Sequence, residues 1–214
     1  MMRLPQQLLT KHDIAHWIDY GTLLGMVRHN GSLIPWEYDA DIALMIEDFN
    51  KLISLKAEAK QSGLGQKCCS FFADTAADCY LIVVGGFHLV QVSNSFARMF
   101  VSEHNGIYVD IYANEVSSYD GNVYNVASGH VDPFPLAFIQ PLVLVHFEGG
   151  VLPAPNNPEG LLDLRYGSDW RHVFKLQAYE VSHVCNSSTT SMEHAQACLR
   201  CACRVGALLT SSLK

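Results

Sequence analysis

Charged residues are scarce in this chain of 214 residues, and basic ones are the scarcer kind. Asp, Glu, Lys and Arg make up 16% of the sequence, with 14 basic residues against 21 acidic ones. The formal net charge of −7 excludes broad electrostatic binding of nucleic acid, because neutralising many phosphates needs a basic surface. Any phosphate must therefore be attracted locally, by a metal ion or by a few basic side chains.

Long apolar runs are also missing. No stretch reaches the roughly 18 uninterrupted apolar residues of a membrane span, and the longest candidates, such as residues 80–87, fit buried strands. Residues 1–7 lack the apolar core of a signal peptide. The sequence therefore predicts no transmembrane segment and shows no targeting signal, which leaves the compartment open.

What is present fits one compact α/β (α+β) domain with a mixed β-sheet flanked by helices. Hydrophobic residues make up 49% of the chain, enough for a full core. Helical periodicity is followed by short apolar runs rather than by repeated βαβ units. The pattern predicts helices over residues 6–18, 48–61 and 158–166, and strands over residues 41–46, 80–84, 88–92, 107–112, 122–126 and 142–147.

The periodicity fails beyond about residue 182, so we expect a catalytic domain over residues 6–181 and a flexible tail over residues 182–214. Seven cysteines are an odd number, which leaves at least one unpaired within the chain. Cys198, Cys201 and Cys203 cluster in the tail, with His194 as the nearest fourth ligand. This spacing matches no standard zinc site, so reactive or fortuitous thiols are favoured over zinc.

Two alternating carboxylates form the first candidate site. In a strand, successive side chains point to opposite faces, so Asp39 and Asp41 would project from one face with small Ala40 between them. Such a pair can share a hard cation, because Mg²⁺ takes protein carboxylates together with substrate phosphates. A nucleotide substrate follows from this interpretation, and a solvated strand end is the alternative.

Gly21 and Thr22 precede this pair. They follow the apolar run 16–20 and lead into the amphipathic stretch 23–28, a pattern that predicts strand, tight turn and helix start. Thr22 would cap the helix, and backbone N–H groups would be free to meet a phosphate. An ordinary turn is the alternative.

Asp110 interrupts a β-branched and aromatic run over residues 106–112. Burying an unpaired carboxylate is costly, so Asp110 is either on the exposed face of an edge strand or paired with a cation. Trp36 offers an aromatic face to a base or a choline-like head group. Core packing beside the metal strand is the favoured alternative for this tryptophan.

Gly-Thr, then Asp-x-Asp, then a lone Asp in a later strand resembles the order of active-site parts in the polymerase-beta-like nucleotidyltransferase superfamily. Residues 17–42 are more specifically similar to the signature of the LicD family, which includes choline-phosphate transferases and fukutin-related proteins. The resemblance covers residues 12–172 and is carried by the segments 20–25, 34–36, 39–41, 109–112, 133–136, 147–149, 153–156 and 164–170, together with Arg28.

The resemblance implies a nucleotidyltransferase-like fold with Mg²⁺ or Mn²⁺ on Asp39, Asp41 and Asp110, and Arg28 on a donor phosphate. It implies that a phospho-alcohol, of the phosphocholine or ribitol-phosphate type, moves from a CDP-activated donor to a glycan hydroxyl with release of CMP. Asp110 would also help to deprotonate that hydroxyl. Resemblance to fukutin-related proteins implies the Golgi lumen.

The sequence departs from the family at two points. Many members have an acidic run directly before the metal pair, where this chain has Glu37 and Tyr38. Fukutin-like proteins also carry a membrane anchor and stem, and the sequence shows neither. Two alternatives therefore stay open: a nucleotide-sugar glycosyltransferase that uses the Asp-x-Asp pair, and a non-catalytic member of the same fold.

Overall fold

The computed structural model describes residues 2–37, 39–61, 65–67, 80–84, 87–100, 107–128 and 133–172. The chain divides into two compact units, Met1–Arg171 and His172–Lys214, and the description below concerns the first. The predicted boundary at residue 182 and the cluster of Cys198, Cys201 and Cys203 lie outside the described residues. None of the described helices is long and apolar enough to cross a membrane.

The described part of the first unit is built on a nine-stranded mixed sheet. Its main path runs β1-β2-β7-β6-β5-β4-β3, with β8 pairing with β7 and β9 with β8. The pair β2 and β7 is parallel and the other pairs are antiparallel. The strands are β1 (Trp17–Ile18), β2 (Asp39–Met45), β3 (Gly65–Lys67), β4 (Tyr80–Val84), β5 (Phe87–Gln91), β6 (Phe96–Phe100), β7 (Tyr108–Val116), β8 (Asn122–Asn125) and β9 (Phe134–Pro135).

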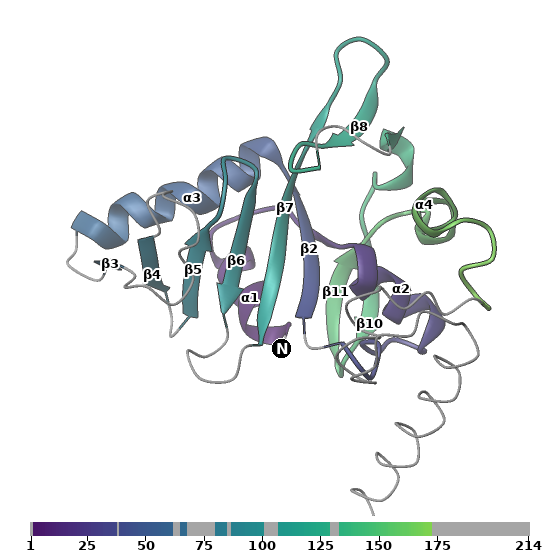
Figure 1. The fold of residues 1–214 in the computed structure, drawn as a ribbon, viewed down its shortest axis with the longest axis horizontal. Helices are drawn as coiled ribbons and strands as arrows, with labels where there is room; N and C mark the ends of the chain where they lie inside the picture. Colours follow the sequence, from purple (N-terminus) through teal and green to yellow (C-terminus); the bar gives the residue numbers. More distant parts are fainter. Residues whose placement is uncertain are drawn as a thin grey trace, which may run out of the picture. The chain divides into compact units, whose positions relative to one another are not determined.

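Helices cover this sheet, and a separate hairpin lies beside its β1 end (Figure 1). The hairpin consists of β10 (Val143–Phe147) and β11 (Gly150–Ala154), and β11 contacts β1. The helices are α1 (Arg3–Lys11), α2 (Tyr20–Arg28), α3 (Ile46–Gln61) and α4 (Pro158–Tyr166), with a 3-10 turn, η1, at Leu136–Phe138. The mixed α/β class predicted from the sequence is therefore confirmed.

Two helices fix the position of β2, the strand with the paired aspartates. Helix α3 follows β2 directly and lies along β2, β7, β4 and β3, with Phe49 and Leu52 fully buried. Helix α2 packs against both β2 and α4. Burial of large apolar side chains is worth about 1.5–3 kcal/mol each, so these contacts hold β2 in place.

Most predicted elements are present, with one clear error at the N-terminus. The helix over residues 158–166 has the predicted bounds, and Asn157 caps it by accepting a hydrogen bond from the Gly160 amide at 3.0 Å. The helix predicted over residues 6–18 is wrong, because α1 ends at Lys11 and a turn with Asp13 at φ +50° follows. Trp17 and Ile18 then pair with β2 instead.

Candidate functional site

The parallel pairing of β2 and β7 sets the geometry of the carboxylates. Asp41 lies directly opposite Asp110, and Asp39 lies opposite Tyr108. Residues paired across a ladder point to the same face of the sheet, and alternate residues of one strand share a face. The structure therefore places Asp39, Asp41 and Asp110 on one face; the strand pattern predicted this for Asp39 and Asp41, and the family resemblance added Asp110. Their role as metal ligands stays a prediction.

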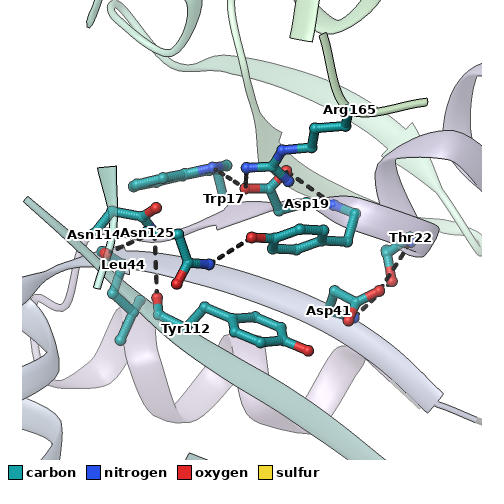
Figure 2. Close-up of polar contacts among 10 residues, drawn as sticks. Trp17, Asp19, Thr22, Asp41, Leu44, Tyr112, Asn114, Asn125 and Arg165 are labelled. Atoms are coloured by element: carbon teal, nitrogen blue, oxygen red, sulfur yellow. Dashed lines mark hydrogen bonds and ion pairs between the residues drawn. The ribbon is translucent and has the colours of Figure 1, made fainter. Parts of the chain in front are cut away.

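The start of α2 lies against Asp41 (Figure 2). The backbone amide of Asp41 donates to Thr22 Oγ1 at 2.7 Å, and the backbone amide of Thr22 donates to Asp41 Oδ2 at 3.4 Å. This reciprocal pair fixes the aspartate relative to the helix terminus. The prediction that Thr22 caps the helix is wrong: α2 begins at Tyr20, with Asp19 as its N-cap, so Thr22 lies inside the first turn.

Gly21 is surrounded by carboxylates. A Cβ atom at this position would lie 2.9 Å from Glu37 Oε2 and 3.2 Å from Asp41 Oδ2. Glu37, from the loop before β2, is therefore a further carboxylate beside the predicted pair. The absence of a side chain at Gly21 lets both carboxylates approach the helix N-terminus, where the positive end of the helix dipole favours negative charge.

Asp41 is the electrostatic centre of this group. Burial raises the pKa of Asp41 well above its usual value, and the neighbouring charges of Asp39, Asp110 and Asp19 raise it further. The hydrogen bond from the Thr22 amide partly offsets these effects. Carboxylates crowded in this way repel each other, so a bound cation would relieve the repulsion.

Asp110 is paired with a cation that the sequence analysis missed. Arg98 lies opposite it on β6 and donates two hydrogen bonds, from Nε to Oδ1 at 2.6 Å and from Nη2 to Oδ2 at 3.1 Å. The guanidinium carbon of Arg98 lies 4.2 Å from the ring centroid of Tyr108 and 5.6 Å from that of Phe96. The second of the two alternatives for Asp110 is therefore correct, with an arginine as the cation.

A second ion pair supports the start of α2 (Figure 2). Both terminal nitrogens of Arg165, from α4, donate to the carboxylate of Asp19, with Nη2 at 2.9 Å from Oδ2. Trp17 Nε1 also donates to Asp19 Oδ2, at 3.2 Å, and the Tyr20 amide donates to Oδ1 at 2.9 Å. The guanidinium lies 3.8 Å from the ring centroid of Tyr20, whose hydroxyl accepts from Asn125 Nδ2.

This network fixes an unusual backbone conformation. Tyr20 has φ +44°, in the left-handed region that is uncommon for residues other than glycine and that costs energy. Its ring is stacked on Arg165 and its hydroxyl is hydrogen-bonded, so the conformation is determined from several sides. The sequence analysis missed Asp19 and Arg165, although an aspartate directly before a helix start is a recognisable N-cap signal.

The other two predicted substrate-binding residues, Arg28 and Trp36, lie at the end of α2 and in the loop before β2. Arg28 is the last residue of α2 and donates from Nη1 to the Trp170 carbonyl oxygen at 3.3 Å. Burial lowers the pKa of Arg28, and the charge of Glu37 partly offsets this. Trp36 is 44% exposed, with its ring edge-on to His29 at 5.9 Å. The favoured interpretation of Trp36 as a core residue is therefore wrong.

The donor set has the chemistry of a hard-cation site, although the arrangement is not closed. Asp39, Asp41 and Asp110 supply only oxygen, which suits Mg²⁺ or Mn²⁺. Among the described residues, no group of three or more His, Cys, Asp or Glu side chains is placed to hold a metal ion. Both oxygens of Asp110 accept from Arg98, so the third carboxylate is engaged elsewhere.

A surface cavity of about 850 Å³ lies at a different place. It is lined by α1 residues, including Gln6 and Lys11, and by the turn of the β10/β11 hairpin. None of the carboxylates described above lines it. The chemistry of the carboxylates, rather than the size of a cavity, therefore defines the candidate site.

Comparisons with known proteins identify similar chains. Residues 13–157 match the family described as LicD/FKTN/FKRP, nucleotidyltransferase domain. The chain is 30% identical over 165 residues to the ribitol 5-phosphate transferase FKRP of Homo sapiens, which covers 75% of the chain and 29% of that protein. It is 28% identical over 116 residues to mannosyltransferase regulator 4 of Saccharomyces cerevisiae, covering 52% of the chain and 9% of that protein.

Among solved structures, the lincosamide antibiotic adenylyltransferase LnuA with lincomycin bound is similar, with a TM-score of 0.44 and 12% sequence identity. That similarity covers 84% of this chain and 89% of LnuA. Compared with the human ribitol 5-phosphate transferase, the chain spans less than a third of that protein's length.

Proposed function

The chain belongs to the LicD/FKTN/FKRP family of nucleotidyltransferase domains, and from this premise we propose that it is a metal-dependent phosphotransferase that modifies a glycan. One observation carries the proposal: Asp41 lies opposite Asp110 on neighbouring parallel strands, with Asp39 on the same face and the start of α2 bonded to Asp41. The similarity to a ribitol 5-phosphate transferase supports a phospho-alcohol as the group transferred.

In the proposed reaction, the oxygen of an acceptor hydroxyl bonds to the β-phosphorus of a CDP-activated alcohol. The bond from this phosphorus to the bridging oxygen breaks, and CMP leaves with that oxygen and its electron pair. The hydroxyl proton passes to a carboxylate of the site, which we assign to Asp110. Such a reaction depends mainly on positioning and on stabilising charge, which suits a site made of fixed carboxylates.

Asp39 and Asp41 would hold Mg²⁺ or Mn²⁺, with Asp110 as the third ligand, and the cation would neutralise charge on the donor pyrophosphate. Thr22 orients Asp41, and Gly21 leaves the space that the carboxylates need. Two further assignments belong to this proposal. Arg28 contacts a donor phosphate, and exposed Trp36 stacks on the base or on a cationic head group.

A non-catalytic member of the family is the second candidate function. Two observations favour it: both oxygens of Asp110 are taken by Arg98, and one relative is named a mannosyltransferase regulator. In that case the chain would bind a nucleotide or a partner enzyme without turnover. Binding and turnover therefore have to be measured separately.

The test is a screen for nucleotide release by the full chain, with Mg²⁺ or Mn²⁺ and a mixture of glycan acceptors. CDP-choline, CDP-ribitol, CDP-glycerol and UDP-sugars are the donors, and Asp41→Asn is the matched inactive control. CMP from a CDP-alcohol, abolished by EDTA and by the variant, is the expected result. UDP from a UDP-sugar would indicate a glycosyltransferase, and nucleotide binding without product would indicate the non-catalytic member.

A further inference from the structure

Arg98 contacts one of the site carboxylates, Asp110, directly. It is paired with Asp110 across β6 and β7, so its side chain lies on the sheet face that carries Asp39 and Asp41. Its two hydrogen bonds engage both oxygens of Asp110. The guanidinium therefore neutralises the buried Asp110 carboxylate, whose burial without a partner would be costly.

The surroundings of Arg98 allow it to leave this carboxylate without losing all of its contacts. Its side chain is 35% exposed, whereas that of Asp110 is 7% exposed. The rings of Tyr108 and Phe96 lie beside the guanidinium on the same face. A planar guanidinium stacks on aromatic faces through its π-system, so a guanidinium that left Asp110 would still have aromatic faces to stack on.

A divalent cation would compete with Arg98 for Asp110. The cation would meet the crowded carboxylates of Asp39 and Asp41 on one side, and Asp110 is the next carboxylate on that face. Once the cation neutralises Asp110, the positive charge of the guanidinium and its two N–H donors no longer have a carboxylate partner. A phosphate group is a bidentate acceptor for such a fork.

We propose that Arg98 is an exchangeable cation of the site: it holds Asp110 before a divalent cation binds, and it moves onto the pyrophosphate of a nucleoside diphosphate when the cation takes Asp110. This inference rests on the proposed function and deepens it, because it names the residue that recognises the donor phosphates.

The test is calorimetric titration of the full chain with Mn²⁺ alone, and then with CDP at saturating Mn²⁺. Arg98→Met removes the competing cation and the phosphate donor, so we expect Mn²⁺ to bind at least about fivefold more tightly and CDP about tenfold more weakly. Arg171→Met is the matched control, because Arg171 also pairs with a carboxylate, Glu159, and stacks on a ring, Trp170. It should leave both affinities within about twofold of the parent's.

Removing a positive charge near the site changes both affinities in these directions even if Arg98 never leaves Asp110, so Arg98→Lys is the variant that separates exchange from a structural ion pair. Lysine keeps the charge and loses the two paired donors, so the exchange predicts unchanged Mn²⁺ affinity and CDP weakened about threefold. Unchanged CDP affinity in Arg98→Lys, or weakening of both affinities in Arg98→Met, would overturn the inference. A parent protein that binds neither Mn²⁺ nor CDP would overturn the proposed function itself, and this inference with it.

Discussion

Two Asp/Arg pairs flank Asp41. They have the same chemistry but differ in burial, in the elements that they join and in the number of further hydrogen bonds. In the first, Asp19 and Arg165 are 0% and 5% exposed and join α4 to the start of α2. In the second, Asp110 and Arg98 lie on neighbouring strands, with Arg98 35% exposed. The first carboxylate also accepts hydrogen bonds from Trp17 and from the Tyr20 amide.

The comparison shows how one type of ion pair serves two purposes. A fully buried pair with several hydrogen bonds is rigid, because removing either partner leaves an uncompensated charge. The Asp19/Arg165 pair can therefore hold the backbone of α2, and through Thr22 it holds Asp41. In the second pair only Arg98 is partly exposed. Arg98 can therefore leave Asp110 without becoming a buried, unpaired charge, which is what an exchangeable partner requires.

The largest expected effect comes from breaking the buried pair. Arg165→Met leaves the charge of Asp19 buried and removes the stacking on Tyr20, so we expect the free energy of unfolding to fall by about 3–5 kcal/mol. Arg98→Met should lower it by less, about 1–3 kcal/mol, because Asp110 stays buried but Arg98 itself is 35% exposed. Urea denaturation of both variants measures the difference.

The control for this experiment removes both charges of the buried pair. Asp19→Asn combined with Arg165→Met should recover part of the lost stability, because no unpaired charge then remains. Equal losses in Arg165→Met and Arg98→Met would contradict the distinction between a locked pair and an exchangeable one.

The second expected effect concerns Asp41, which both pairs flank. Asp41→Asn keeps the shape of the side chain and removes its charge, so we expect turnover to fall at least about 100-fold. The free energy of unfolding should stay the same or rise, because crowded carboxylates repel each other. Mn²⁺ should raise the melting temperature of the parent and leave that of the variant unchanged.

A matched substitution controls for the loss of any carboxylate. Asp120 lies in the exposed turn between β7 and β8, and Asp120→Asn should leave both turnover and the response to Mn²⁺ unchanged. Near-normal turnover of Asp41→Asn would remove the basis for the proposed chemistry.

Local patterns predicted that Asp39 and Asp41 share a face, because side-chain alternation in a strand depends on neighbouring residues alone. Asp110 shares that face because of the register between β2 and β7, which alternation alone does not predict. The two arginines could not be found in this way. Arg165 meets Asp19 across 146 positions of sequence, and the pairing of Arg98 with Asp110 depends on the register between β6 and β7, which is set by the whole sheet.

The remaining errors of the sequence analysis concern β6, Trp36 and the start of α2. Strand β6 was not predicted, because Arg98 interrupts a run of only five residues, Phe96–Phe100. Trp36 was expected in the core because tryptophan is large and apolar, yet its loop is anchored by Ile34, which is 2% exposed, and leaves the indole outside. Thr22 and Asp19 are both good N-caps, and the structure shows that Asp19 is the cap, with an extended backbone and a carboxylate that accepts from the Tyr20 amide.

A third, smaller effect tests the buried side of the comparison through pH. His16 lies just before β1, is 4% exposed, and accepts no hydrogen bond at Nε2 within the described part of the chain. Burial lowers the pKa of His16, while the hydrogen bond with the Ile14 carbonyl and the charge of Asp48 oppose this. The folded protein therefore holds this histidine neutral.

The sign of the pH effect follows from proton linkage. Below about pH 6.5 the unfolded chain takes up a proton that the folded protein does not, so stability falls as the pH drops, by up to about 1.4 kcal/mol per pH unit. The stability that the folded protein gains from keeping His16 neutral is fully present above about pH 6.5. His16→Gln should remove this part of the slope between pH 7 and pH 5, measured by urea denaturation. An identical slope in parent and variant would show that His16 is not held neutral.

The smallest expected effect tests the exposed side of the site. Trp36 is 44% exposed, so Trp36→Ala should change the free energy of unfolding by less than about 1 kcal/mol. If the indole stacks on the base or on a cationic head group, the KM for the donor should rise about threefold to tenfold while kcat stays nearly constant, since one aromatic contact is worth about 1 kcal/mol.

Trp36→Phe should retain most of the affinity, and Tyr119→Ala, at a 97% exposed tyrosine of the β7/β8 turn, should change neither constant. A drop of several degrees in the melting temperature of Trp36→Ala, with KM unchanged, would mean that the indole contributes to packing rather than to binding.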